Sequence, residues 1–185
     1  TGAEAEHLFL EGTGSMVLDR DNRIAYACLS PRTNKSLVDR FCQQMNFTAV
    51  TFFARDQQGQ EIYHTNVMMG VADQYVVICL ASITDLAEQS AVLKAINDTH
   101  KKVIDISIEQ MNAFAGNMLQ VRNNMGAPFL VMSTQAFTSL DAQQRAKLEE
   151  FNPIIHADIS TIESNGGGSA RCMMAELFLP EKSSL

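Results

Sequence analysis

The sequence predicts an α/β fold built from a repeated unit of strand, turn, strand, helix and strand. Three observations support this prediction. Three segments of the 185-residue chain can be laid over one another, short apolar runs are bounded by Asn, Asp and Gly, and a helix-like stretch follows each pair of runs. The predicted hairpins end at Ser30, Ser82 and Ser133, a period of about 52 residues.

In the first unit, the apolar residues 14–18 form the first predicted strand. A turn at Asp21 and Asn22 leads to the second strand over residues 23–30, because short polar residues at this position favour a tight turn. A helix-like stretch over residues 31–46 follows, and residues 48–54 form the third strand.

The second unit repeats this order. Residues 66–71 and 75–82 form a predicted hairpin around a turn at residues 73–74. Residues 84–100 form a predicted helix, since Leu86, Val92, Leu93 and Ile96 recur at roughly helical spacing and Asp85 can cap its start. The unit ends in a strand over residues 102–106.

The third unit begins at Asn117. Residues 117–121 and 128–133 form its predicted hairpin, with a turn at residues 123–126 that contains two Asn and a Gly. A predicted helix over residues 139–151 is polar except for one apolar side, and a strand over residues 154–159 completes the unit.

A fourth unit begins with a predicted strand at Cys172, shortly before the sequence ends. Such a unit cannot bury its own apolar surface, so units must pack against each other, and radial packing about an axis achieves this. We expect a propeller-like architecture of about three to three and a half blades, in which a closed ring returns the last strand to the first unit. Because the sequence starts at Thr1 without Met, we expect further residues before it.

Composition excludes several classes of protein. The formal net charge is -7 and no Lys/Arg cluster follows a predicted element, so nucleic acid is not an expected partner. The apolar runs fall far short of the ~20 residues that span a bilayer, and no signal segment opens the chain. Hydrophobic residues make up 46% and charged residues 19%, which is typical of a packed, soluble protein, here expected in the cytoplasm.

The four cysteines are expected to be reduced thiols. They form no CxxC pair, and a chain of this length does not need disulfides for stability. Cys28 and Cys79 lie in apolar predicted strands and Cys42 lies in a predicted helix, where a buried, inert thiol is the expected role. Cys172 differs, because Arg171 precedes it and three glycines stand just upstream.

Residues with reactive side chains stand just before the first strand of successive units. Glu11, His64 and Cys172 occupy such positions in three units, and Asn117 occupies the position in the remaining one. Because equivalent positions in a radial repeat converge on the axis, we expect a carboxylate, an imidazole and a thiol to meet. A thiol is the nucleophile that needs least activation, and an imidazole both donates and accepts protons near neutral pH.

Neither a metal site nor a nucleotide cofactor is expected. No two of these His, Cys or carboxylate residues stand at a short ligand spacing. The run from Gly166 to Gly168 lacks the GxGxxG spacing and precedes a predicted strand instead of a helix. These glycines are expected to shape a turn that approaches a substrate closely.

Three motifs resemble those of the pentein, or guanidine-modifying, superfamily, which includes arginine deiminase, dimethylarginine dimethylaminohydrolase and the amidinotransferases. They are Phe9-Leu-Glu11-Gly12, His64-Thr-Asn66 and Gly167-Gly-Ser-Ala-Arg171-Cys172-Met173. The sequence is most similar to the bacterial amidinotransferase-like, citrulline-utilising hydrolases, and the resemblance covers nearly the whole chain. It implies a five-bladed ββαβ propeller, with residues 1–185 forming the C-terminal three-fifths of a single catalytic domain.

The resemblance also implies a mechanism and a substrate. Cys172 would attack the central carbon of a guanidino or ureido group, His64 would protonate the leaving amine and then activate water, and Glu11 would hold the substrate nitrogens. The implied partner is a small guanidino or ureido amino acid such as arginine or citrulline. Its expected binding residues are Asn66, Gly12, Asn117, Gly168 and Arg171.

One residue departs from the family pattern. Arginine deiminases carry an Asp two residues after the His, whereas Asn66 stands here. An amide donates as well as accepts hydrogen bonds, so we expect Asn66 to favour citrulline-like over arginine-like substrates.

Three alternatives remain open from the sequence. An amidinotransferase uses the same Cys, His and Glu and passes the amidino group to an amine instead of water. A non-catalytic pentein uses the fold for binding, which the presence of Glu11, His64 and Cys172 argues against. A truncated product would be stabilised as a homo-oligomer through unpaired strand edges, because five blades require roughly 250 residues or more at this period.

Overall fold

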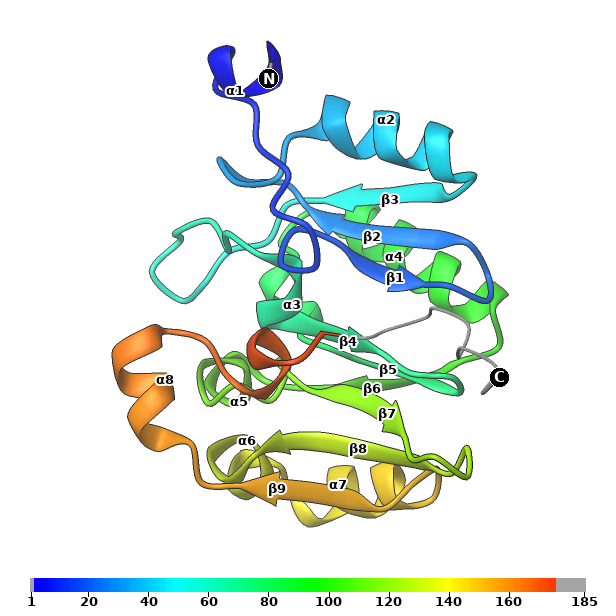
Figure 1. Ribbon diagram of the computed structural model, residues 1–185, viewed down its shortest axis with the longest axis vertical. Coiled ribbons are helices and arrows are strands. Elements are labelled where there is room, and N and C mark those ends of the chain that lie inside the picture. The colour runs from blue at the N-terminus through cyan, green and yellow to red at the C-terminus, as the bar shows by residue number, and fades with distance from the viewer. Residues whose placement is uncertain (1, 176–185) are drawn as a thin grey trace, which may run out of the picture.

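The three predicted repeat units are present in the computed structural model, which describes residues 2–175 (Figure 1). Each unit forms one three-stranded sheet, in which the first two strands pair antiparallel and the third pairs parallel to the second. A helix connects the second and third strands, because parallel neighbours need a crossover connection. The mixed α/β class predicted from the repeat is therefore confirmed.

The first unit begins with a short helix and contains the first sheet. Its helix α2 starts where the Asn34 side chain accepts a hydrogen bond from Ser36 N and ends at Asn46, which has the left-handed φ of 56° common at helix ends. The elements are α1 Gly2–Ala5, β1 Val17–Asp19, β2 Ile24–Cys28, α2 Lys35–Met45 and β3 Thr48–Phe52.

The second unit contains two short helices that the sequence analysis assigned to strands. The backbone forms a helical turn over residues 65–68 and a 3-10 turn over residues 80–82, so its strands are shorter than predicted. The predicted cap at Asp85 is confirmed, since its side chain accepts from Ala87 N and Glu88 N. The elements are α3 Thr65–Met68, β4 Met69–Val71, β5 Tyr75–Ile78, η1 Leu80–Ser82, α4 Leu86–Asp98 and β6 Lys102–Asp105.

The predicted helix of the third unit, over residues 139–151, begins later than expected and is preceded by a separate short helix. Asp141 and Gln144 form a capping box, so a new helix starts at Ala142 and the preceding residues belong to a separate short helix. The elements are α5 Ile108–Asn112, β7 Leu119–Arg122, β8 Pro128–Ser133, α6 Thr134–Ser139, α7 Ala142–Glu149 and β9 Ile154–Ala157.

The segment after β9 differs from the prediction. Residues Ser160–Gly166 form helix α8, which ends where Gly167 adopts a left-handed φ of 69°. Residues Ala170–Met173 form the 3-10 helix η2 in place of the predicted strand at Cys172. Residues 174–175 are not in a strand either, and the remainder of that predicted strand, with its return to the first unit, lies in residues 176–185, outside the described residues.

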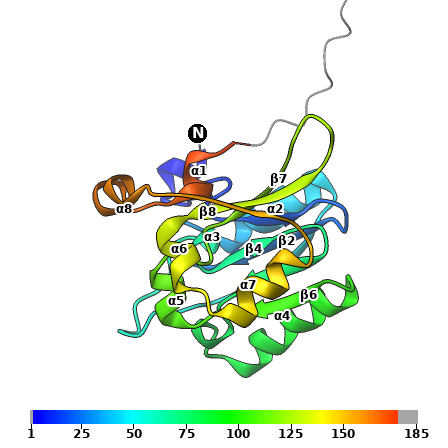
Figure 2. The same ribbon diagram turned by 90° about the horizontal axis from the view of Figure 1, so that it is seen from below.

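Helices of successive units separate the sheets. On one face of the first sheet, Val38 and Cys42 of α2 pack in a cluster with Ala25 and Ala27. The helix α4 of the second unit contacts β3 of the first unit and β6 of its own (Figures 1 and 2). The main core runs through all three units, with Tyr26, Phe52, Met68, Val92, Ile96, Met132 and Leu148 among its buried side chains.

The first strands of the three sheets lie side by side, β1 against β4 and β4 against β7. Thr65 ties the first two units together in the core, because its buried Oγ1 accepts from Cys28 N at 2.7 Å and donates to Ser15 O at 2.6 Å. This arrangement brings the loops that precede β1, β4 and β7 to one end of the sheets. Among residues 2–175, the helices fall short of the length and apolarity needed to cross a membrane.

Candidate active site

The loops before the first strands meet through hydrogen bonds between units. Asn66 N donates to Gly14 O at 3.2 Å, which links the loops before β4 and β1. Asn117 Nδ2 donates to Asn66 O at 2.9 Å, which links the loops before β7 and β4. The same Asn117 amide lies 3.2 Å from Cys172 Sγ. The loops before β1, β4 and β7 and the thiol of Cys172 therefore meet in the structure.

Glu11 and His64 form the ionisable pair of the site. Glu11 Oε2 and His64 Nε2 are 2.6 Å apart, with the Glu11 side chain 42% exposed and His64 18%. Tyr63 lies against one side of the imidazole, with ring centroids 4.8 Å apart. Gly14 lies against the ring too, since a Cβ there would come within 2.8 Å of it. A glycine at position 14 therefore allows the imidazole to lie against the first loop.

Cys172 is the exposed thiol of the chain, in the short helix η2. Its backbone N donates to Ser169 O at 3.0 Å, and the buried Ser169 hydroxyl donates to the buried Glu163 carboxylate at 2.6 Å. Gly168 is close to the thiol, because a Cβ there would lie 3.0 Å from Cys172 Cβ and 3.2 Å from Sγ. Gly168 therefore makes room for the Cys172 side chain.

Asn66 is buried, with 3% of its surface exposed. Its Nδ2 lies 3.7 Å from Cys172 Sγ, and its Oδ1 has no hydrogen-bond partner. A buried carbonyl oxygen without a partner is unfavourable, so a ligand N–H at this point would stabilise the site. The atom left for a ligand is an acceptor, whereas the citrulline preference expected from the sequence relied on the amide as a donor.

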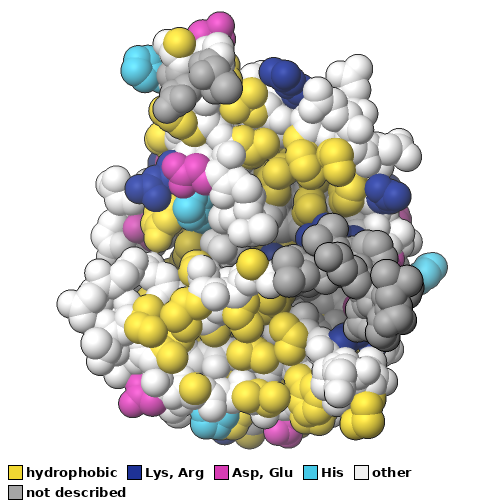
Figure 3. All heavy atoms as spheres, viewed as in Figure 1, with side chains coloured by type: hydrophobic (Ala, Val, Ile, Leu, Met, Phe, Trp, Pro, Cys, Tyr) yellow, Lys and Arg dark blue, Asp and Glu magenta, His cyan; other side chains and the backbone are white. Residues whose placement is uncertain are grey.

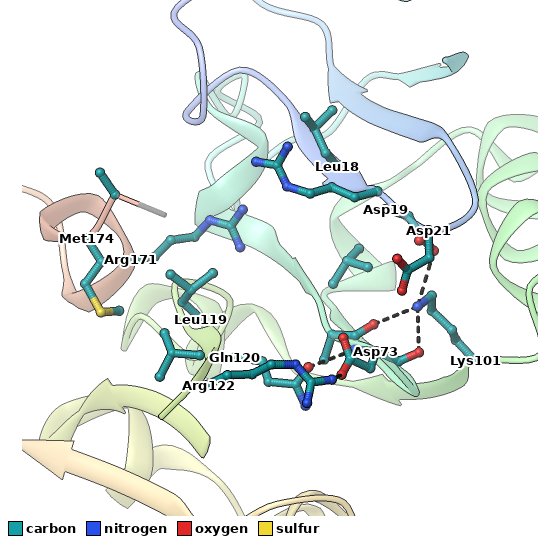
Figure 4. A pocket seen from close by; sticks show the side chains of 15 residues that line it. Leu18, Asp19, Asp21, Asp73, Lys101, Leu119, Gln120, Arg122, Arg171 and Met174 are labelled. Atoms are coloured by element: carbon teal, nitrogen blue, oxygen red, sulfur yellow. Dashed lines mark hydrogen bonds and ion pairs between the residues drawn. The ribbon is translucent and has the colours of Figure 1, made fainter. Parts of the chain in front are cut away.

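The remaining predicted site residues lie further from the thiol or hold the loops. Gly12 has a left-handed φ of 56° in the turn before β1, and its carbonyl accepts from Met16 N. Arg171 Nη1 lies 3.5 Å from Met118 O, and Figure 4 shows its side chain extending into a cavity beside the site. Among residues 2–175, no hydrogen bond joins His64 to Cys172, so a substrate would have to bridge them.

That cavity, of about 670 Å³, runs along β1, β4 and β7 and does not contain Glu11, His64 or Cys172 (Figure 4). Several of its charged side chains are paired: Lys101 Nζ donates to Ala72 O and Asp73 O and lies 3.4 Å from Asp19, and Arg122 pairs with Asp73. The described residues contain no group of three or more His, Cys, Asp or Glu that could hold a metal ion.

Arg32 is a site residue that the sequence analysis missed. Its guanidinium lies 3.8 Å from Glu11 Oε2 and 4.9 Å above the Tyr63 ring, and its side chain is 54% exposed. The strands β1 and β2 are antiparallel, so residues that follow β2 lie at the same end as residues that precede β1. That relation was available from the predicted hairpin and could have identified Arg32.

The other three thiols are poor nucleophiles. Burial raises the pKa of Cys28 to about 12 and also raises the pKa values of Cys42 and Cys79. A raised pKa leaves less thiolate at neutral pH, and burial blocks access to reagents. The inert role expected for these three cysteines agrees with their surroundings.

Comparison with protein families shows one match along nearly the whole chain. The family model described as N,N dimethylarginine dimethylhydrolase, eukaryotic, matches residues 1–179. No curated protein matches the chain.

Solved structures share the fold. ArgZ, an arginine dihydrolase from cyanobacteria, is 18% identical with a TM-score of 0.70, over 88% of this chain and 24% of ArgZ. AgrE in complex with ornithine and NAD+ is 17% identical with a TM-score of 0.73, over 95% of this chain and 24% of AgrE. SxtG, an amidinotransferase from Microseira wollei, is 11% identical with a TM-score of 0.58, over 86% of this chain and 42% of SxtG.

The chain is shorter than these similar proteins. It spans about a quarter of ArgZ and 54% of the separate N-terminal domain of ArgZ, which has been solved with substrate, with product and covalently bound to a reaction intermediate. At identities below 20%, these similarities establish the shared fold.

We predict that iodoacetamide modifies only Cys172 in the folded chain at pH 8, because the other three thiols are buried with raised pKa values. Intact-protein mass spectrometry should show one adduct on the folded wild type and none on folded Cys172→Ala. After unfolding in guanidinium, the wild type should carry four adducts. Rapid labelling of two or more cysteines before unfolding would contradict the described burial.

Proposed function

Because the chain belongs to the N,N dimethylarginine dimethylhydrolase family, within the guanidine-modifying superfamily, we propose that it cleaves a C–N bond of a guanidino or ureido amino acid through a covalent intermediate on Cys172. The observation that carries the proposal is the convergence of an exposed thiol, two buried amides and a Glu–His pair from four separate segments.

In the proposed first half-reaction, the Cys172 thiolate attacks the central carbon of the guanidinium and forms a C–S bond. The C=N electron pair moves onto nitrogen and gives a tetrahedral adduct. His64 donates a proton to the departing nitrogen, the C–N bond breaks, and an amine leaves a thiouronium on Cys172.

In the second half-reaction, neutral His64 accepts a proton from water as the water oxygen attacks the same carbon. The C–S bond then breaks, the electron pair returns to sulfur as a thiolate, the hydroxyl proton of the adduct passes to solvent, and the product leaves as a ureido compound. Glu11 supports both steps, because a carboxylate 2.6 Å from Nε2 stabilises the imidazolium that forms when the ring gains its proton. Its exposed part can accept hydrogen bonds from a cationic substrate.

Two further side chains are proposed to hold the substrate. The unpartnered Oδ1 of Asn66 accepts an N–H from the guanidino or ureido group, since it is the free polar atom beside Sγ. Arg32 binds the carboxylate of the amino acid, because its exposed guanidinium lies next to Glu11 at the edge of the site.

We also propose that the three units are consecutive blades of a larger ring and part of one catalytic domain. Helix α4 packs against β3 of the unit before it, and Gln144 of α7 donates a hydrogen bond to Asp105 O at the end of β6 in the unit before it. The corresponding face of the third sheet is incompletely covered, and Ile155 is 49% exposed there. Figure 3 shows apolar side chains in the lower part of the viewed surface, where Figure 1 places the third unit. A further unit packed on this face would bury them, as in a propeller.

An amidinotransferase remains the second candidate, because SxtG shares the fold and the proposed covalent step is the same in both reactions until water or an amine attacks. Ornithine or glycine added to an assay with arginine would distinguish them. Transfer would yield a new amidino compound from the added amine, whereas hydrolysis would yield only the ureido product.

The proposed reaction centre predicts selective inactivation by 2-chloroacetamidine, which mimics a guanidinium. The rate at which it modifies Cys172 is compared with the rate for the neutral isostere 2-chloroacetamide, and this ratio is divided by the same ratio for free cysteine. We expect the resulting preference to be at least about tenfold, because Glu11 and Asn66 present acceptors to the amidinium. Glu11→Gln should reduce this preference, and Cys172→Ala should give no adduct at this position. Equal preference in wild type and free cysteine would reject the proposed recognition.

The Asn66→Asp variant tests the residue that departs from the arginine deiminase pattern. A carboxylate beside Sγ attracts a guanidinium more strongly than a neutral ureido group. We expect the ratio of kcat/KM for arginine to kcat/KM for citrulline to rise about tenfold or more, even if both values fall. A ratio equal to that of the wild type would contradict a substrate contact at Asn66.

The Arg32→Ala variant tests carboxylate binding. Loss of one charge-assisted contact is expected to raise KM for arginine by about 10–100-fold. Agmatine, which lacks the carboxylate, should show nearly the same KM with both proteins. Arg55→Ala, in an exposed arginine paired with Glu61, is the matched control. An equal rise of KM for both substrates would show that Arg32 acts through Glu11 instead.

A further inference from the structure

Two neutral amides contact the exposed sulfur of Cys172. Within residues 2–175, the side chains that share hydrogen-bond contacts with Sγ are the carboxamides of Asn117 and Asn66, at 3.2 Å and 3.7 Å from their Nδ2 atoms. The neighbouring Arg171 extends into the cavity along the strands (Figure 4). Within that range, the side-chain hydrogen-bond contacts to the sulfur therefore come from the two amides.

The orientation of the Asn117 amide follows from its second contact. One of its atoms lies 2.9 Å from the backbone carbonyl of Asn66, and only the NH2 end can donate to that oxygen. The opposite orientation would place two acceptors against each other. The NH2 group has two hydrogens, so one bonds the Asn66 carbonyl and the other is available to Sγ.

The amide is also held rigidly. Asn117 is 2% exposed, and its backbone N donates to Phe114 O at 2.9 Å in a turn where Phe114 adopts a left-handed φ of 65°. Gly116 packs so tightly that a Cβ there would lie 2.4 Å from Val67 O. A donor fixed in this way costs little to order when charge develops on the sulfur.

We propose that Asn117, assisted by Asn66, forms a neutral amide clamp that stabilises the thiolate of Cys172, so that Asn117 acts on the nucleophile instead of on the substrate. This inference rests on the proposed function, which makes Cys172 the nucleophile. Hydrogen bonds to a charged acceptor are stronger than those to a neutral one, so two amide donors favour thiolate over thiol. The thiol can in turn donate to Asn117 Oδ1, 3.5 Å away, when it is protonated.

The clamp also explains how the site uses Asn66. Its Nδ2 points toward the sulfur while its Oδ1 has no partner, so one carboxamide can contact both the nucleophile and the substrate nitrogen. Because both clamp residues are neutral, a cationic guanidinium can approach Sγ without repulsion from a positive side chain of the clamp.

The experiment measures the rate at which iodoacetamide modifies Cys172 between pH 5 and pH 10, followed by intact-protein mass spectrometry. Asn117→Ala removes the donor, and Asn117→Asp replaces it by a nearly isosteric acceptor. We expect the midpoint of the pH profile to move upward by about one pH unit in Asn117→Ala and further in Asn117→Asp. Below the midpoint this corresponds to labelling about tenfold slower or more. Asn124→Asp, in the exposed turn between β7 and β8, should retain the wild-type profile.

Protection of Cys28 from the same reagent reports whether each variant is folded, because this thiol is fully buried. An unchanged or lowered midpoint in a variant that protects Cys28 would overturn the inference. Exposure of Cys28 in both variants would assign Asn117 a structural role and also overturn it. Alkylation of Cys172 does not require catalytic turnover. If the Asn117 variants shift the pH profile of alkylation but the wild type hydrolyses no substrate, the amide clamp is supported and only the proposed activity is rejected.

Discussion

The candidate site depends on the hydrogen bonds that pass from one repeat unit to the next just before each first strand. Asn66 N bonds Gly14 O, and Asn117 Nδ2 bonds Asn66 O, so each loop is positioned by the unit before it. Thr65 adds a buried link between the same two units. Because no single unit contains two of the three reactive side chains, their separation is set by how the units pack. A change that shifts one sheet would misplace the thiol relative to the imidazole.

The four thiols lie in two different environments. Three cysteines lie in the core, where burial raises their pKa values and removes them from solvent, and Cys172 is exposed on a short helix. The same separation applies to charge around the site. Glu11 and His64 form an ionisable pair on one side, while buried neutral amides face the sulfur on the other. This division suits chemistry in which a proton moves at His64 and negative charge develops at sulfur.

The central strand of each sheet follows from the sequence more closely than the short helices do. Strand pairs bounded by Asn, Asp and Gly carry a local signal, and β2, β5 and β8 lie where it predicts. The short helices α3, α5, α6 and α8 span four to seven residues, too few for apolar periodicity to appear. Cap signals existed, since Ser107 and Gln110 form a capping box at α5. The strand predicted from the repeat to begin at Cys172 was wrong over residues 172–175, because residues 172–173 belong to the 3-10 helix η2 and residues 174–175 are not in a strand.

The sequence by itself determined the repeat, the α/β class and the residues that stand before each first strand, because these depend on local pattern and on periodic position. It identified Glu11, His64, Asn66, Asn117 and Cys172 as a group, which the fold brings together. Only the tertiary structure decided what each side chain faces. It directed Arg171 toward a cavity, placed Arg32 beside Glu11, left Asn66 Oδ1 without a partner and turned the Asn117 amide toward sulfur. These orientations arise from contacts between residues 21 to 106 positions apart in the chain, which no local pattern encodes.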